Sequence, residues 1–434
     1  MEKLRVLIAL GFKYLYRYRR RYGFFLAALV ISFAVVTLIT SLKDGMYENV
    51  YYTAQSHYAG DVIALASDSV YKNRMGKKEI DIILNAAEKA GINPKFTIKR
   101  TMYLSDGVVF FNGNAVQLKY LMGCDWKDEK PLMEKMNFTE TPDFNFGNDS
   151  IILSHPTADQ IGARMGDSVI LEVNTVDGQK NTGVFIVKGI VQDSSIFGYF
   201  KAYIGRVSLN RLLGFKDDDC SSIGFFLDNP DTAEQKRLFL YAELSGKLQL
   251  APLIKNRDEM NIARDEVFKG LKIFLYTLPV YLSEIADLLS AMNLITYFLY
   301  VMMLLIILFS AATTYRLLLH ERTREMGIMR TIGFYGKDLR LILWVEMLGL
   351  GIVALAAGFI LAVIISYIIS LFSFSWFPSF EIFMKNGKLT ALYLAKSTAI
   401  NVASVFLILF LVTIFPSFRA SRKNLPDLLA GEPL

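Results

Sequence analysis

Residues 288–315 read LLSAMNLITYFLYVMMLLIILFSAATTY and contain no charged side chain. A helix of roughly 20 apolar residues is long enough to cross the hydrocarbon core of a bilayer. Three further stretches have the same character: Gly23–Leu42, Met347–Phe380 and Ser397–Phe418. Because every backbone N–H and C=O group must find a partner inside hydrocarbon, we expect all four stretches to be membrane-spanning helices.

The composition agrees with a membrane protein that also carries a large polar domain. Of the 434 residues, 53% are hydrophobic and 20% are charged, which is more apolar than an ordinary soluble domain. The formal net charge of +6 is too modest to indicate nucleic acid as a partner. Residues 43–287, between the first and second apolar stretches, are numerous enough to bury a core of their own.

Basic residues mark one side of the membrane. Lysine and arginine are concentrated in residues 3–21, 316–340 and 419–423. By the positive-inside rule these parts are cytoplasmic, so both termini lie in the cytoplasm and residues 43–287 lie outside. The loop 376–396 contains three lysines and runs against the rule, but the even number of spans decides the topology.

The segments next to the membrane have helical patterns. Apolar Leu4, Ile8, Phe12 and Leu15 form one stripe within residues 1–22, which predicts an amphipathic helix lying on membrane lipids. Two further segments flank the outer domain and are expected to form helical stalks, the second of them interrupted at Pro279. These are residues 44–54 and 256–287.

Alternating patterns within the outer stretch predict an α+β domain. Helices are expected at Lys78–Ala90 and Thr157–Gly162. The dipeptides Asp106-Gly107, Asn112-Gly113 and Asp177-Gly178 indicate turns. Strands are expected at residues 61–65, 96–104, 108–111, 115–121, 150–154, 168–173 and 183–191.

The outer domain shows no motif for catalysis or metal binding. It has no G-x-S-x-G or H-E-x-x-H sequence, and the three histidines of the chain have no spacing typical of a metal site. Cys124 and Cys220 both fall in this domain. An oxidising compartment would permit a disulfide between them, and two separate buried thiols fit the sequence as well.

The cytoplasmic segment 316–340 contains the most distinctive run. Glu321, Arg324 and Glu325 belong to a charged helical half, after which apolar residues return, and Gly333 breaks the helix. A short amphipathic helix with exposed apolar residues beside fixed charges indicates a protein partner. In the next span, Glu346 lies near the cytoplasmic interface, where it can reach water or pair with a base on a neighbouring helix.

The run ERTREMGIMRTIG at residues 321–333 resembles the signature of the FtsX/MacB-like ABC transporter permeases. The ending RASRKNLPDLLAGEP at residues 419–433 and the outer segments 150–154, 158–167 and 185–191 are similar to that family too. The resemblance implies four spans with an extracytoplasmic core domain after the first. It also implies a short helix that couples the permease to an ATPase through residues Glu321, Arg324, Glu325, Gly327, Ile328, Arg330, Gly333 and Glu346.

The resemblance also implies partners and a location. They are two copies of an ABC ATPase subunit and a second permease copy or paralogue, in the inner membrane of a bacterium. The chain has no G-x-x-x-x-G-K-[ST] motif, so ATP and Mg²⁺ are expected on the ATPase subunit and no cofactor, metal or catalytic residue on this chain.

The size of the outer stretch makes the lipoprotein-releasing, Lol-type permeases the nearest in plan. They would add lipoproteins and a periplasmic carrier or adaptor to the partners. A macrolide or peptide exporter is one alternative, and an FtsX-like transmitter that switches a cell-wall hydrolase is another. The expected layout is residues 1–22 cytoplasmic helix, 23–42 first span, 43–287 outer domain with stalks, 288–315 second span, 316–340 coupling segment, 341–375 third span, 376–396 outer loop, 397–418 fourth span and 419–434 cytoplasmic tail.

Overall fold

The computed structural model describes residues 9, 13, 19–68, 73–92, 94–192, 198–265, 268–283, 286–374, 378–385 and 387–422. The chain forms two compact units. The first contains residues 1–47, 289–374 and 388–434, and the second contains residues 48–288 and 375–387. Most of the predicted helix at residues 1–22 and of the tail at 419–434 lies outside the described residues.

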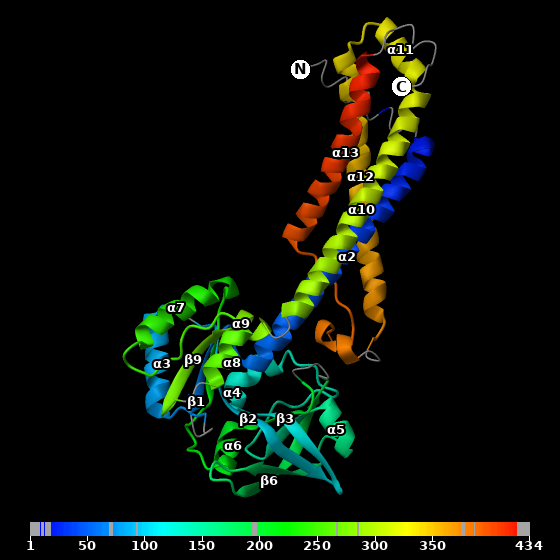
Figure 1. The fold of residues 1–434 in the computed structure, drawn as a ribbon. Coiled ribbons are helices and arrows are strands. Elements are labelled where there is room, and N and C mark those ends of the chain that lie inside the picture. Colours follow the sequence, from blue (N-terminus) through cyan, green and yellow to red (C-terminus); the bar gives the residue numbers. More distant parts are fainter. Residues whose placement is uncertain are drawn as a thin grey trace. The chain divides into compact units, whose positions relative to one another are not determined.

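Four long helices account for the first unit, and Figure 1 labels each of them. Each contains a stretch long and apolar enough to cross a membrane, which confirms the predicted number of spans. A short helix, α11 (Thr323–Thr331), connects the second long helix to the third. The long helices are α2 (Arg19–Tyr58), α10 (Ala286–Glu321), α12 (Gly336–Leu371) and α13 (Ala395–Arg422).

Small residues let the long helices approach one another closely. A Cβ atom at Gly358 of α12 would lie 2.8 Å from the carbonyl oxygen of Val30 in α2. At Gly351, about two turns earlier, a Cβ atom would meet Leu409 of α13 at 2.9 Å. Glycine at both positions therefore allows α12 to pack on two neighbours at once, as small residues do between membrane helices.

Polar side chains add hydrogen bonds between the spans. The amide of Asn401 in α13 donates to Thr40 of α2 over 2.8 Å, and the amide of Asn293 in α10 donates to the Tyr47 hydroxyl of α2. The Tyr300 hydroxyl of α10 donates to Ser404 of α13 over 2.8 Å. These pairs fix which faces of the helices meet, because an unpaired polar group is costly in an apolar surrounding.

The second unit is an α+β domain between the first and second spans, as the sequence predicts. Its helices include α3 (Lys77–Lys89), α4 (Trp126–Met133), α5 (His155–Ile161), α6 (Arg206–Leu213), α7 (Ala233–Leu244), α8 (Arg257–Asp265) and α9 (Leu278–Leu282). Its strands are β1 (Val62–Asp68), β2 (Phe96–Phe111), β3 (Asn114–Cys124), β4 (Ser150–Ser154), β5 (Ser168–Asn174), β6 (Lys180–Val191), β7 (Lys201–Gly205), β8 (Ser222–Phe226) and β9 (Leu271–Thr277).

One part of the sheet closes into a ring, and the other part extends from that ring. The strand order is β3-β7-β4-β6-β5-β2-β8-β1-β9, and β3 also pairs with β2. Strands β3, β7, β4, β6, β5 and β2 therefore form a closed ring. The long strand β2 serves both parts, since its first half pairs with β8 and its second half with β5.

Each part of the sheet has its own core. Helices α3 and α7 cover one face of β1, β8 and β9, where Ile83 and Leu240 are fully buried. Helix α8 packs on the other face of β9. Side chains of α5 and α6, such as Ile161 and Leu209, join the core of the ring.

Two predictions for this domain are wrong. The dipeptide Asp106-Gly107 is not a turn, because β2 runs through it with a bulge between Leu104 and Gly107. The second stalk is not a continuous helix, because residues 271–277 form strand β9. Ile273 faces one core and Phe274 the other, so both faces of the strand are apolar, and such a run cannot be distinguished from a helix by periodicity.

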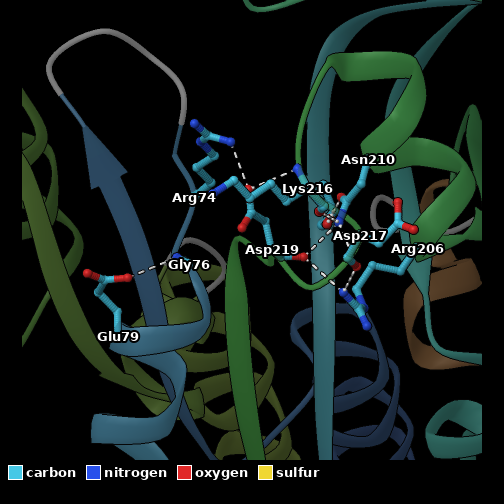
Figure 2. Close-up of polar contacts among 9 residues, drawn as sticks. Arg74, Gly76, Glu79, Arg206, Asn210, Lys216, Asp217 and Asp219 are labelled. Atoms are coloured by element: carbon cyan, nitrogen blue, oxygen red, sulfur yellow. Dashed lines mark hydrogen bonds and ion pairs between the residues drawn. The ribbon is translucent and has the colours of Figure 1, made fainter.

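A polar network fixes the loop between α6 and β8 (Figure 2). The amide of Asn210 donates to the backbone carbonyls of Lys216 and Asp219 over 2.9 and 2.8 Å. Arg206 donates to the carbonyls of Asp217 and Asp219, and Arg74 pairs with the Asp219 carboxylate at 2.7 Å. These contacts satisfy backbone groups that the irregular loop leaves unpaired, and so position β8.

The end of α2 is held within the second unit by a buried arginine. Arg100 of β2 donates to the backbone carbonyls of Ser56 and His57 over 2.9 and 2.8 Å, and pairs with the Glu129 carboxylate over 2.5 and 2.8 Å. The chain then turns and crosses β8 at Gly224, where a Cβ atom would lie 1.4 Å from the Ala59 carbonyl oxygen. Only glycine allows that approach.

Candidate coupling site

Helix α11 is bounded by local interactions at both ends. The Thr323 hydroxyl donates to the Leu319 carbonyl over 3.1 Å where α10 ends. After α11 the backbone of Gly333 takes a φ of +102°, a conformation that favours glycine. Asp338 then accepts a hydrogen bond from the Tyr335 backbone N–H over 3.0 Å and starts α12. The predicted break at Gly333 thus separates two well-formed helices.

One face of α11 is buried against the membrane helices. Met326 and Met329 belong to the same core as Phe25 of α2 and Leu343 of α12. Gly327 is also buried, which brings the helix backbone close to its neighbours. The long, unbranched methionine side chains fill the irregular space between α11 and the long helices. α11 is therefore packed into the first unit along its length.

The opposite face of α11 is exposed. Ile328 and Ile332 have exposed fractions of 48% and 74%, and Tyr335, just beyond the helix, has 66%. Glu321 and Arg324 are exposed too. Within α11, Arg324 and Ile328 are four residues apart and so lie on one side of the helix, and Ile332 follows four residues later at its C-terminal end. A short apolar strip with a charged beginning is a suitable surface for a protein partner.

A buried ion pair joins the start of α11 to α12. The Arg322 Nη1 atom lies 2.5 Å from the Glu346 Oε2 atom, and both side chains are almost fully buried. The Tyr22 hydroxyl of α2 donates to the same carboxylate oxygen over 3.2 Å. Arg322 also lies 3.5 Å from Glu325 of α11. Three helices of the first unit therefore meet at one charge pair.

This pair is a fixed connection rather than a surface contact. Removing one member of a buried pair leaves an uncompensated charge, which typically costs about 3–5 kcal/mol. The second carboxylate oxygen of Glu346 and the Tyr315 hydroxyl of α10 are buried without a hydrogen-bond partner among the described residues. Each such atom costs free energy comparable to a lost hydrogen bond.

The predicted coupling residues fall into three groups. Glu321, Arg324, Ile328 and Gly333 are exposed, Glu325 and Arg330 are partly buried, and Gly327 and Glu346 are buried. The eight residues therefore do not form one surface. The sequence did not predict Arg322, the partner of Glu346 in the buried pair, or Tyr22, which donates a hydrogen bond to Glu346, as site residues. An isolated acid at the end of an apolar span needs a base as its partner. That requirement makes a nearby arginine the expected partner, but it does not distinguish Arg322 from the neighbouring arginines.

The described residues contain no group of three or more histidine, cysteine or acidic side chains placed to hold a metal ion. Cys124 and Cys220 are both free and buried. Burial raises the pKa of the Cys220 thiol to about 12. The sequence left a disulfide open, and the structure has two separate thiols.

Comparison with known proteins finds a family match in the second half of the chain. Residues 297–425 match the family described as FtsX-like permease C-terminal. This part, which includes α11, Arg322 and Glu346, is similar to the C-terminal region of FtsX-like permeases. No curated protein matches the chain at a significant level.

Three solved structures with similarity to this chain are each a domain or region of another protein. The extracellular domain of the noncanonical ABC-type transporter YknZ from Gram-positive bacteria is 11% identical, covers 49% of this chain and 98% of that one, and gives a TM-score of 0.28. The periplasmic region of MacB from Actinobacillus actinomycetemcomitans is 11% identical, covers 54% and 96%, and gives 0.30. A domain of a putative permease from Porphyromonas gingivalis is 9% identical, covers 44% and 75%, and gives 0.27.

Proposed function

We propose that this chain is the membrane-spanning subunit of an ABC transporter and that separate subunits hydrolyse the ATP. The single observation that carries the proposal is the α11 segment, in a region that matches the FtsX-like permeases. Its inner face is packed into the four long helices, while its outer face presents Ile328 and Ile332. A partner that moves this outer face would move helices of the first unit with it.

The proposed orientation places α11 and both termini in the cytoplasm and residues 43–287 outside the membrane. The basic residues at 316–340 support it through the positive-inside rule. In this arrangement two ATPase subunits bind a pair of permease chains on the cytoplasmic side. The chain itself transmits movement and carries out no reaction.

The proposal is tested by substitution on the exposed face of α11. Ile328→Asp places a charge on the apolar strip, and Ile328→Leu keeps the strip apolar at the same position. We expect the full-length wild type and Ile328→Leu to co-purify with an ATPase subunit from the native membrane, and Ile328→Asp to lose at least nine-tenths of it. If no ATPase accompanies the wild type, or if Ile328→Asp retains its share, the proposal is wrong.

For the cargo we propose release of lipoproteins from the inner membrane. The support is the size of the outer domain and its position after the first span, which resemble the Lol-type plan. Depletion of the chain should leave acylated proteins in the inner membrane fraction. Normal lipoprotein sorting with altered efflux of drugs or peptides would favour an exporter instead, and normal sorting with defective wall cleavage would favour an FtsX-like transmitter.

A further inference from the structure

A pocket in the second unit has the volume of a small-molecule site. It lies between α2, the turn Pro230–Thr232 with the start of α7, the segment before α8, and the junction of β9 with α9. Its volume is about 490 Å³, within the range of about 300–1,000 Å³ that is typical of ligand pockets. Ile254, Pro279 and Val280 form an apolar part of the wall.

Two of the four charged residues in the described lining neutralise each other. Arg237 of α7 donates to both carboxylate oxygens of Glu234, over 3.0 and 2.5 Å. Its Nη1 atom donates to the backbone carbonyls of Ile254 and Leu275 over 3.1 and 3.3 Å. Arg237 is only 1% exposed. The pair is therefore a fixed part of the pocket wall and leaves its charges to no ligand.

The other two charged residues of the lining are opposite in sign and do not pair with each other. Asp231 and Lys255 are both exposed, and their charged groups form no ion pair within the part of the chain that the structure describes. The Asp231 carboxylate is close enough to Tyr51, another lining residue, for its charge to act on the hydroxyl group. Both charges are thus available to a molecule in the pocket.

Buried polar groups fix one wall of the pocket. The Tyr51 hydroxyl donates to the Asp61 carboxylate over 3.0 Å, and this carboxylate also accepts from the Gln55 amide over 2.7 Å and from the Leu227 backbone N–H over 2.8 Å. Thr277 lines the pocket and is 3% exposed, and its hydroxyl has no hydrogen-bond partner among the described residues. A buried hydroxyl requires a partner, which a ligand can supply.

We infer that this pocket binds a small zwitterion, a molecule that carries both an ammonium group and an anionic group. The ammonium group pairs with Asp231 and the anionic group with Lys255, while an apolar part of the ligand packs on Ile254 and Val280. A ligand with a single charge would meet a like charge in the same pocket. The described lining holds two acids and two bases, which matches a ligand without net charge.

Such a zwitterion can be a short peptide with free termini or the headgroup of phosphatidylethanolamine. The test uses the full-length protein and the variant Asp231→Asn/Lys255→Gln. Both residues are exposed and the net charge is unchanged, so the variant should fold. Asp218→Asn/Lys127→Gln makes the same change at exposed positions of the same unit that do not line the pocket, and serves as the matched control.

Binding of the dipeptide Leu-Ala is measured by ligand-observed NMR titration in detergent. Retention of phosphatidylethanolamine over phosphatidylglycerol is measured by mass spectrometry after reconstitution in discs that contain both lipids. We expect the wild type and the control to bind at least one of the two probes, and the pocket variant to bind it roughly fivefold more weakly or worse. Peptide binding alone assigns a free zwitterion, and lipid retention alone assigns a headgroup.

Blocked peptides test the two charges separately. N-acetylated Leu-Ala lacks the ammonium group and the Leu-Ala amide lacks the carboxylate, so each should bind more weakly than a dipeptide that the pocket accepts. Thr277→Val removes the hydroxyl without changing the charge, and it should weaken binding of the accepted probe by roughly twofold or more.

The inference is overturned if the wild type binds neither probe, or if the pocket variant binds as well as the wild type. It is also overturned if a blocked peptide binds as well as Leu-Ala. These measurements require neither an ATPase subunit nor knowledge of the cargo, so their failure would leave the proposed function untouched.

Discussion

The buried pair of Arg322 and Glu346 allows a quantitative test of how α11 is held. Arg322→Met preserves most of the side-chain volume and removes the cation that lies 2.5 Å from the carboxylate. Glu346 is 2% exposed, so its charge would remain buried without its main partner. We expect a cost of about 3–5 kcal/mol. The cost applies only while α11 is docked, because undocking lets water reach Glu346. The free energy needed to undock the helix is therefore lower in the variant by this amount.

Hydrogen exchange of the α11 amides measures that free energy directly. Since a tenfold change corresponds to about 1.36 kcal/mol, exchange should accelerate by roughly 100- to 5,000-fold in Arg322→Met. The double variant Arg322→Met/Glu346→Met removes both charges, and its exchange should stay within about tenfold of the wild type. Arg324→Met, an exposed arginine on the same helix, is the control and should change exchange by less than about threefold.

Two results would refute this reasoning. The first is an Arg322→Met variant that exchanges like the wild type, since the pair would then contribute nothing to docking. The second is a double variant that exchanges as fast as Arg322→Met or faster. In that case the loss would come from packing around residue 322 and not from an uncompensated charge.

Three further predictions concern close packing and buried thiols. Gly224→Ala should destabilise the second unit by roughly 3 kcal/mol or more, because the new Cβ atom would meet the Ala59 carbonyl at 1.4 Å; Gly107→Ala, with its nearest atom at 3.6 Å, should cost far less, and equal shifts in thermal denaturation would contradict this. Gly358→Ala should lower the thermal stability of the detergent-purified chain, since its Cβ atom would lie 2.8 Å from the Val30 carbonyl, whereas Ala356→Leu on the exposed face of α12 should not. Cys220 should resist alkylation at pH 8 until the protein is unfolded, because its thiol has a pKa of about 12 and is buried; labelling of the native protein within minutes would disprove that.

The membrane part of the fold could be predicted because hydrocarbon imposes a simple rule. Long uncharged stretches had to be helices, and the four helices confirm this except at the end of the third stretch, where α12 ends at Leu371. The hydrogen bonds of Asn293 and Asn401 also follow from the cost of an unpaired amide among apolar side chains. Strand β9 could not be predicted in this way. Its alternate side chains face two different cores, so the pattern of the sequence carried no strand signal.

The sequence predicted a docking helix at residues 321–333, and that role stays a prediction; it did not predict how the side chains of the helix are arranged. The charged and apolar residues of 321–333 indicated a docking helix, and Ile328 has the exposure that such a role requires. The sequence could not show that Arg322, and not Arg324 or Arg330, turns inward. That choice depends on where Glu346 and Tyr22 meet in space, and these residues are far apart in the chain.

The pairing of β1 with β9 has a consequence for how such proteins diversify. Val62 lies opposite Thr277 and Asp68 opposite Leu271, so the polypeptide enters and leaves the domain through two adjacent antiparallel strands. A segment whose ends meet can be excised and replaced as a cassette, since the exchange leaves the two junctions at the same separation. Recombination at this seam would give the same membrane helices a new α+β domain in a single step.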